Sequence, residues 1–356
     1  MTSTAGPTDL ASLGWDQGFE KHLDQGLEPA RVAVEHRGSY VVHSAGGEMP
    51  AAITGRMRHA AQGRADLPAV GDWVGVRVPP GERRALIHTV LPRRSSFSRK
   101  VAGVVTEEQV VAANVDTVFL VSALNQELNL RRAERYLTMA WESGAQPVIV
   151  LSKADLCNDV VGAIADFSSI APGCPIHAVS IVTDEGFAEL AVYFIGNRTV
   201  ALLGSSGVGK STIVNRLVGD DKQTVRDIRA DGKGRHTTTH RELLSVPGGG
   251  LVIDTPGMRE LQLWDSGEGL DSTFSDITEL AAGCRFNDCT HEREPGCAVI
   301  AALESGRLEP QRLQSYRKLQ RELAFLARKQ DKALAHEEAR KWKRLNRDAR
   351  ARARHR

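Results

Sequence analysis

The spacing of apolar residues predicts an all-β region near the start of the chain. From Ala30 to about Arg99, short runs of apolar and β-branched residues are separated by Gly and Pro, which is typical of strands joined by turns. The runs are Arg31–Val34, Tyr40–Val42, Ala52–Thr54, Trp73–Val78 and Ala85–Val90. Five short strands at this spacing predict a small barrel over residues 30–99, either an OB-fold, which we favour, or an SH3-like barrel. Residues 1–29 show no repeating period and are expected to form a flexible leader.

The pattern changes after Ala113, where apolar strands alternate with amphipathic helices. The predicted strands are Thr117–Val121, Pro147–Leu151, Ile176–Val179, Thr199–Leu203 and Gly250–Ile253. The predicted helices are Leu130–Ser143, Val160–Ile170, Phe187–Ile195 and Gly209–Val218. Continuous apolar strands joined by helices predict an α/β domain over residues 100–264, whose mainly parallel sheet is covered on both faces. Ligands bind such sheets at the carboxyl ends of the strands.

The segment after the strand Thr199–Leu203 has the sequence of a phosphate-binding P-loop. The pattern Gly-x-x-x-x-Gly-Lys-[Ser/Thr] is filled by Gly204, Ser205, Ser206, Gly207, Val208, Gly209, Lys210 and Ser211, with Thr212 next. Its glycines let the backbone approach phosphates closely, and the helix that follows presents its positive N-terminus to them. Lys210 is expected to reach the β- and γ-phosphates, and the Ser211 hydroxyl to bind Mg²⁺. A chance Gly-rich turn is disfavoured by the strand before and the helix after.

A second motif points to guanine. Ser152, Lys153, Ala154 and Asp155 follow a predicted buried strand, where the carboxylate of Asp155 would accept two hydrogen bonds from the guanine edge. Adenine lacks that pair of donors, so Asp155 predicts GTP rather than ATP. Ser180, after the next strand, is expected to add a backbone contact to the base; an ordinary loop with a helix cap is the alternative interpretation. Because this motif precedes the P-loop, the order of motifs predicts a circularly permuted GTPase domain.

A third motif, Asp254-Thr-Pro-Gly257, closes the last predicted strand. Asp254 is expected to support Mg²⁺ through water, and the Gly257 N–H to meet the γ-phosphate. Between this motif and the P-loop lies a polar segment that we interpret as a switch loop. Its hydroxyls, among them Thr237 and Thr238, are available for the metal, and His236 is a candidate for positioning the attacking water.

The cysteines predict a metal site rather than disulfides. Cys284, Cys289, His291 and Cys297 lie within fourteen residues of a chain with five cysteines and no export signal. Three thiolates and one imidazole form the ligand set of a closed, structural zinc site, with one zinc per chain. Redox pairing of these cysteines is the alternative. Residues 265–356 are therefore expected to form a mainly helical zinc-binding domain with a basic helical tail.

Composition and charge indicate the compartment and the kind of partner to expect. In 356 residues, 41% of them hydrophobic, no run approaches the roughly 18–20 apolar residues of a membrane span. The first residues lack an export signal, so we expect a monomer in the cytoplasm with no membrane partner. Residues 306–356 carry 17 Lys/Arg and 6 Asp/Glu, a charge of +11 that leaves −9 on the rest of a chain whose total is +2. This asymmetry favours a polyanionic partner over a solvated helix end.

Taken together, these motifs resemble the bacterial family of ribosome small-subunit-dependent GTPases A (RsgA/YjeQ). The resemblance rests on Pro68–Trp73, Leu91–Arg94, the P-loop, the polar segment 234–239, Asp254–Gly257 and the cysteine cluster. It implies an OB-fold barrel, a circularly permuted GTPase domain and a C-terminal zinc domain. It also implies contact with the small ribosomal subunit and its ribosomal RNA, and GTP hydrolysis late in subunit assembly. The family usually has Asn where this chain has Ser152, which implies somewhat weaker selection of guanine.

The hydrolytic machinery is less complete than in Ras-like GTPases. Met258 occupies the position after Asp-x-x-Gly at which those enzymes carry a water-orienting glutamine. We therefore expect slow intrinsic turnover of GTP to GDP and phosphate, and stimulation by the small subunit. Two alternatives stay open: an RNA-binding scaffold that uses GTP as a structural switch with negligible turnover, and a nucleic-acid-dependent ATPase, which Asp155 disfavours.

Overall fold

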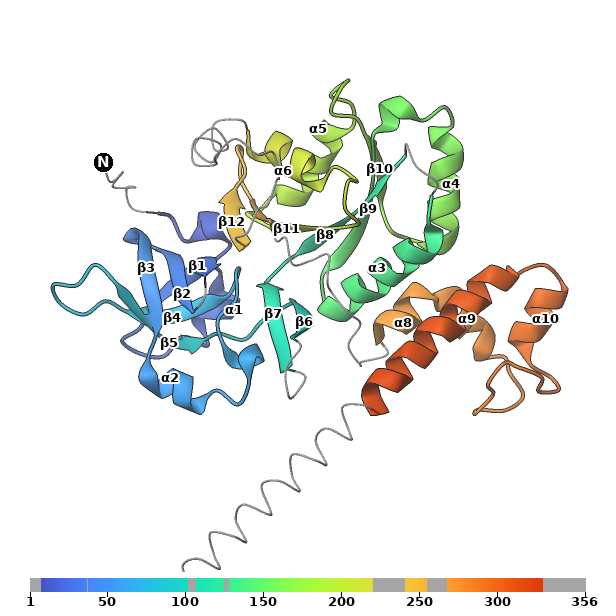
Figure 1. Cartoon of the computed structure of the whole chain (residues 1–356), viewed down its shortest axis with the longest axis horizontal. Coiled ribbons are helices and arrows are strands. Elements are labelled where there is room, and N and C mark those ends of the chain that lie inside the picture. Colours follow the sequence, from blue (N-terminus) through green and yellow to red (C-terminus); the bar gives the residue numbers. More distant parts are fainter. Residues whose placement is uncertain are drawn as a thin grey trace, which may run out of the picture. The chain divides into compact units, whose positions relative to one another are not determined.

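The computed structural model describes residues 8–36, 38–101, 107–124, 128–219, 241–254 and 268–328. The chain divides into two units, Met1–Gln262 and Leu263–Arg356, whose elements are labelled in Figure 1. Within the described ranges, no helix has the length and apolar character needed to cross a membrane. Several predicted features lie outside these ranges, namely His236, Thr237, Thr238, Gly257, Met258 and the basic tail after Arg328.

Five strands form the predicted barrel. They pair in the order β1-β2-β3-β5-β4, and β4 returns to pair with β1, which closes the barrel. Their bounds are β1 (Glu28–His36), β2 (Ser39–Ser44), β3 (Gly47–Ile53), β4 (Trp73–Arg77) and β5 (Ala85–Val90). Alternate side chains such as those of Val32, Val42, Val74 and Ile87 are fully buried inside it. Helix α2 (Gly55–Ala60) follows β3, and the OB-fold prediction is confirmed.

The segment before the barrel is packed from about Thr8 onward. It contains the short helices η1 (Ala11–Leu13) and α1 (Gln17–Glu20), and the side chains of Leu13 and Phe19 are buried. The ring of Trp15 lies 4.7 Å, and that of Phe19 5.9 Å, from the ring of Trp73. The structure therefore differs from the expected flexible leader over residues 8–27. These helices are too short to produce a period, so the pattern of apolar residues missed them.

Six strands form the sheet of the α/β region, in the order β10-β9-β8-β11-β13-β12. All neighbours are parallel except β13 and β12. The strands are β8 (Thr117–Ala123), β9 (Gln146–Ser152), β10 (Ile176–Val179), β11 (Thr199–Leu203), β12 (Arg241–Ser245) and β13 (Leu251–Asp254). The parallel strands follow the prediction, and their carboxyl ends meet at one edge.

Helices cover both faces of this sheet, as Figure 1 shows. Side chains of α5 (Phe187–Leu190) and α6 (Lys210–Val218) pack with Phe119 and Val121 of β8 in one apolar core. On the other face lie α3 (Leu130–Ser143) and α4 (Val160–Ile170), which match the predicted helices. Local signals explain that match. The Asn129 side chain caps the start of α3 by accepting a 2.9 Å hydrogen bond from the Arg132 N–H, and Gly144, at φ 84°, ends it.

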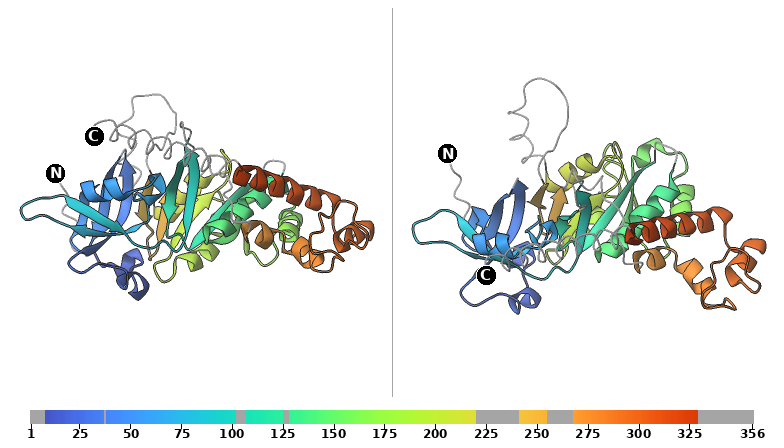
Figure 2. Two further views of the ribbon diagram at one scale, coloured as in Figure 1. Left: turned by 90° about the horizontal axis from the view of Figure 1, so that it is seen from below. Right: turned by 60° about the horizontal axis from the view of Figure 1, so that its bottom comes forward.

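Three strands were not predicted from the sequence. Strands β6 (Ser96–Val101) and β7 (Glu107–Ala113) pair as an antiparallel hairpin. Their charged residues hide any alternation of apolar positions. Strand β12 pairs with β13 on one side and with barrel strand β1 on the other, so barrel and α/β strands form one continuous eleven-stranded sheet (Figure 1, Figure 2).

The second unit is mainly helical, as predicted. It contains α8 (Glu268–Thr273), α9 (Ser275–Ala281), α10 (Ala298–Glu304) and a longer helix over residues 310–328. The long helix buries Leu319 and Leu323. Arg312, on the same helix, is 4% exposed and holds Asp276 of α9 at 2.8 Å. This ion pair between a buried guanidinium and a partly exposed carboxylate joins the long helix to α9.

Candidate nucleotide and metal sites

The P-loop needs glycine for geometric reasons. At Gly204, directly after β11, the backbone has φ 157°, and a Cβ there would lie 2.4 Å from the carbonyl oxygen of Val121. Gly207 and Gly209 adopt φ 81° and 92°, the left-handed region that side chains disfavour. The loop ends where α6 begins, so its amides and the N-terminus of that helix face the same region. This arrangement binds anions such as phosphates.

The lysine of the motif lies over this loop. The Nζ of Lys210 donates 2.7 Å hydrogen bonds to the carbonyl oxygens of Gly204 and Ser205. Phosphate oxygens arriving at the loop amides would lie within reach of the same ammonium group. Ser211 follows in the first turn of α6 with an exposed side chain, where its hydroxyl is accessible to a cation bound with the phosphates.

The predicted base-binding segment lies against the P-loop, although 56 residues separate Ser152 from Val208. The Ser152 hydroxyl is in contact with the carbonyl oxygens of Val208, at 2.6 Å, and Ser122, at 3.3 Å. Lys153 adopts φ 59°, and its Nζ donates a 3.1 Å hydrogen bond to the carbonyl oxygen of Gly207. A non-glycine residue in this conformation is strained, and its hydrogen bond to the loop holds it there.

Asp155 is oriented by a residue from the next strand. Its Oδ1 accepts a 2.6 Å hydrogen bond from the hydroxyl of Ser180, which is fully buried after β10. The same hydroxyl oxygen accepts a hydrogen bond from the Thr183 N–H at 3.2 Å. Asp155 itself is exposed, so its carboxylate is held in one direction and remains open to a ligand. The structure thus brings together Ser152, Lys153, Asp155 and Ser180 beside the P-loop.

One contact that sequence reasoning missed lies on the same side of the domain. Arg216 of α6 donates hydrogen bonds of 2.7 and 2.8 Å to the two carboxylate oxygens of Asp184, and its guanidinium lies 5.7 Å from the ring centre of Phe187. The pair joins the P-loop helix to the loop that begins at Ser180. Both side chains are about half exposed, so the expected stabilisation is small. No local pattern in the sequence signals this long-range pairing.

Asp254 ends β13, which runs parallel to β11 with Ile253 opposite Ala201. Its position places a carboxylate on the strand next to the one that leads into the P-loop. With Ser211 it offers oxygen ligands, which Mg²⁺ prefers. The other residues predicted for this part of the site, His236, Thr237, Thr238 and Gly257, lie outside the described residues.

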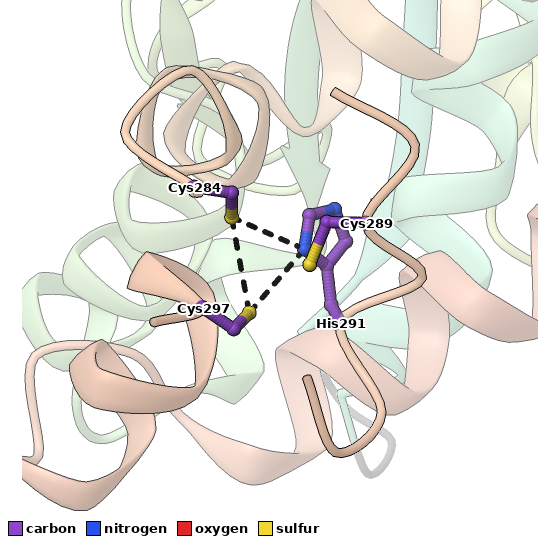
Figure 3. Close-up of side chains that lie close together, drawn as sticks. All are labelled: Cys284, Cys289, His291 and Cys297. Carbon is purple, nitrogen blue, oxygen red and sulfur yellow. Dashed lines mark hydrogen bonds between the residues drawn. The ribbon is translucent and has the colours of Figure 1, made fainter. Parts of the chain in front are cut away.

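The four predicted zinc ligands converge in the second unit, as Figure 3 shows. Their ligand atoms all lie within 4.8 Å of one another. The Sγ atoms of Cys284 and Cys297 are 3.8 Å apart, and each lies 3.5 Å from the Nδ1 of His291. Tetrahedral zinc, with Zn–S of about 2.3 Å and Zn–N of about 2.0 Å, requires separations of about 3.8 Å between two sulfurs and about 3.5 Å between sulfur and nitrogen. The cluster fits one structural zinc ion, with Cys289 as the fourth ligand.

The loop between two of these ligands is held by a carboxylate. Glu294 accepts hydrogen bonds from the N–H groups of Thr290 at 2.9 Å, Glu292 at 2.8 Å and Arg293 at 3.0 Å. The Thr290 hydroxyl, followed by backbone N–H groups that include those of Thr290 and Arg293, lowers the pKa of Glu294 to about 2. At neutral pH the carboxylate is therefore ionised and can fix the backbone around His291.

Removing the Ser152 hydroxyl tests its link to the P-loop. In Ser152→Ala the Val208 and Ser122 carbonyl oxygens lose their contact with this hydroxyl, at a cost of about 1–2 kcal/mol. We expect the Kd for GDP to rise about tenfold, measured by calorimetry. Ser168→Ala, which removes an exposed helical hydroxyl bonded only within α4, is the control. Equal affinities for the two variants would contradict a role of Ser152 in holding the loop.

Two family models match the sequence. The model described as RsgA GTPase matches residues 90–264, and the model described as 50S ribosome-binding GTPase matches residues 199–331. A protein from Opitutus terrae named small ribosomal subunit biogenesis GTPase RsgA is 52% identical and covers 97% of this chain and 98% of its own length. The protein of the same name from Streptomyces coelicolor is 46% identical, over 96% and 94%.

Solved structures agree with the fold. YjeQ from Thermotoga maritima superposes with a TM-score of 0.63 and 28% identity, covering 83% of this chain and 98% of that one. YloQ, described as a circularly permuted GTPase, gives a TM-score of 0.62 over 84% and 96% of the two chains. At 24% identity, this second likeness concerns the fold alone. The permuted order of motifs predicted from the sequence is confirmed.

Proposed function

The chain belongs to the RsgA family of GTPases, and from this premise we propose that it binds the small ribosomal subunit as a monomer and hydrolyses GTP to time a late step of the subunit's assembly. The reaction yields GDP and phosphate. Subunit assembly places the protein in the cytoplasm, a reducing compartment that suits its free cysteines.

The observation that carries this proposal is the contact between the base-binding segment and the P-loop. Ser152 and Lys153 are hydrogen-bonded to backbone carbonyls of the loop, while Ser180 orients the carboxylate of Asp155. A triphosphate bound at the loop amides would therefore extend its base toward a fixed acceptor of two hydrogen bonds. Guanine offers the matching pair of donors, and adenine does not.

Each residue then has a specific role. The loop amides and Lys210 stabilise the charge that develops on the phosphates, which is the main source of catalysis in phosphoryl transfer. Ser211 would bind the Mg²⁺ that accompanies GTP, together with Thr237 or Thr238, and Asp254 would support it through water. Gly257 contacts the γ-phosphate, and His236 positions the attacking water once the subunit is bound.

The small subunit is the partner named in the relatives, and its ribosomal RNA is the part of it that this chain contacts. The support is the charge of the C-terminal region, because +11 over residues 306–356 attracts a polyanion. The zinc ion shapes the unit that carries this region. It takes no part in hydrolysis, because four protein ligands leave no position for water.

The experiment that tests the proposal is GTP turnover by the purified protein with and without purified small subunits. We expect slow turnover alone and at least a tenfold increase with subunits, and no turnover in either condition for Lys210→Ala. Turnover unchanged by subunits would refute the stimulated GTPase. In that case nucleotide-dependent binding to subunits without turnover would favour the second candidate, a scaffold switched by GTP, which Met258 in the place of a water-orienting glutamine supports.

A further inference from the structure

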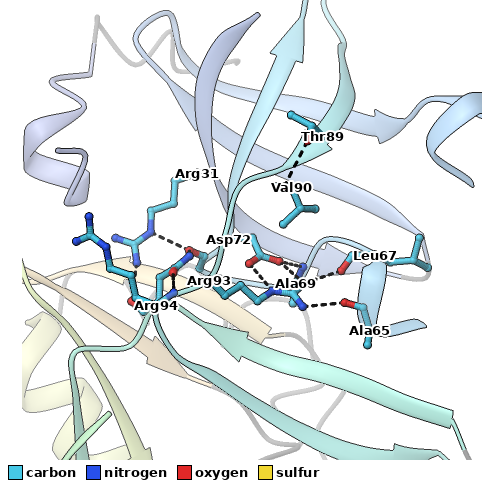
Figure 4. Close-up of polar contacts among 11 residues, drawn as sticks. Arg31, Ala65, Leu67, Ala69, Asp72, Thr89, Val90, Arg93 and Arg94 are labelled. Atoms are coloured by element: carbon cyan, nitrogen blue, oxygen red, sulfur yellow. Dashed lines mark hydrogen bonds and ion pairs between the residues drawn. The ribbon is translucent and has the colours of Figure 1, made fainter. Parts of the chain in front are cut away.

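A buried arginine lies where the barrel meets the α/β region. Arg31 of β1 is 2% exposed, and its guanidinium lies 5.6 Å from the ring centre of Trp73. The nearby carboxylate of Asp72 is already engaged, since Arg93 donates two 2.8 Å hydrogen bonds to it (Figure 4). Burial lowers the pKa of Arg31 to about 10, so the group stays charged at neutral pH. A buried cation is retained only where acceptors surround it.

The acceptors of Arg31 come from four separate segments. Its Nε donates to the Gly71 carbonyl at 3.2 Å, before β4, and its Nη1 donates to the Leu13 carbonyl of the packed leader. Its Nη2 donates to the Asn114 carbonyl at 3.1 Å and to the hydroxyl of Thr199 at 2.8 Å. Thr199 is the first residue of β11, the strand that ends at the P-loop. One side chain thus joins the leader, the barrel and the nucleotide-binding strand.

Strand β1 is also connected, through β12, to Asp254, the residue expected to support Mg²⁺. Val34 of β1 pairs with Glu242 of β12, and Glu242 pairs in turn with Asp254 at the end of β13. Strand β1 is therefore linked to β11, which leads into the P-loop, and to β13, which ends at Asp254. It contacts β11 through Arg31 and Thr199, and β13 through the backbone ladder of β12.

From these contacts we infer that Arg31 is a positioning residue that couples the barrel to the nucleotide site. Nucleotide binding therefore stabilises the barrel, and a partner held by the barrel alters the nucleotide site. The inference rests on the proposed function, because it needs a nucleotide at the P-loop. Coupling of this kind is reciprocal and typically amounts to a factor of 5 to 150. The Thr199 hydroxyl is the one acceptor of Arg31 that a conservative substitution removes while the backbone stays intact.

The test is hydrogen exchange of the full-length protein with and without GDP and Mg²⁺. In the unmodified protein we expect GDP to slow exchange at P-loop amides and, about tenfold, at amides of β1 and β4. In Thr199→Val the protection of the P-loop should remain, whereas that of β1 and β4 should fall below twofold. Thr199→Ser keeps the hydroxyl and should restore the coupling. Thr117→Val, at a buried threonine on the neighbouring strand β8, is the matched control.

The outcomes separate the inference from the function on which it rests. If Thr199 had a purely structural role, Thr199→Val would speed exchange equally with and without GDP and would leave the ratio of the two rates unchanged. That result would overturn the inference. Barrel protection that is absent in the unmodified protein, or that persists in Thr199→Val, would overturn it as well. If GDP fails to protect even the P-loop, guanine-nucleotide binding is wrong. Hydrogen exchange with and without ATP then decides whether the barrel responds to any nucleotide. If exchange in the barrel does not change with ATP either, the inferred coupling is overturned as well.

Discussion

Replacing Asp155 with asparagine is expected to change the preferred base from guanine to xanthine. The carboxylate accepts hydrogen bonds from two guanine donors, whereas the asparagine amide presents an N–H₂ group to one of them. One hydrogen bond is replaced by a donor–donor clash and the other loses its charge assistance, at a cost of about 3 kcal/mol or more, so the Kd for GTP should rise at least a hundredfold. Xanthine carries a carbonyl where guanine carries its amino group, and that carbonyl can accept from the amide. The measurement is competition between GTP, XTP and ATP for the P-loop.

Rescue by xanthine makes this prediction specific. Misfolding of Asp155→Asn would weaken all nucleotides alike, and tight XTP binding excludes it. Ser180→Ala is a companion variant, since it removes the 2.6 Å hydrogen bond that orients the carboxylate and should weaken GTP without favouring XTP. A variant that binds GTP as well as the unmodified protein does would show that Asp155 does not read the base.

Removal of zinc is expected to unfold the second unit. Structural zinc contributes about 10–16 kcal/mol of binding free energy, which exceeds the stability that a small helical unit gains from its core. Cys297→Ser should therefore abolish stoichiometric zinc and expose residues 268–328 to protease. Cys297 has two roles in this unit, because its sulfur also accepts a 3.5 Å hydrogen bond from the Ile300 N–H at the start of α10. Zinc content and limited proteolysis measure the effect.

Cys157→Ser provides the control for thiol loss, since Cys157 lies outside the cluster and should leave zinc content at one ion per chain. GDP affinity should be unchanged in Cys297→Ser, because the P-loop and its partners belong to the first unit. A Cys297→Ser protein that resists protease without zinc would contradict a structural role for the metal.

Residues with local signals were predictable from the sequence. Helix α3 begins and ends as expected because Asn129 and Gly144 are strong capping residues, and the P-loop is a contiguous motif with a strand before it. The approach of Ser152 and Lys153 to the P-loop also followed from the sequence, since parallel strands end at one edge of a sheet. The cysteine spacing was sufficient to predict a zinc site.

Contacts between distant parts of the chain were not predictable. From its residue type alone, Arg31 would be expected on the exposed face of its strand. In the structure it is buried, and one of its acceptors is 168 residues away in the sequence. Phe19 lies in a helix too short for a period, and Trp15 lies between two such helices. Strands β6 and β7 carry charges that mask their pairing. In each case tertiary packing decided the structure, and no single segment encodes it.

The acceptors of Arg31 also determine the order in which the protein can be completed during synthesis. The barrel can close once β5 has emerged, but Thr199 follows Arg31 by 168 residues, which at ~5–20 residues per second is a delay of roughly ten to thirty seconds. Until then Arg31 lacks the Thr199 hydroxyl as an acceptor, and the end of β1 that pairs with β12 stays an open edge until residues 241–245 have also been made. The nascent chain is therefore most prone to aggregate in this interval, before the ribosome has finished making it.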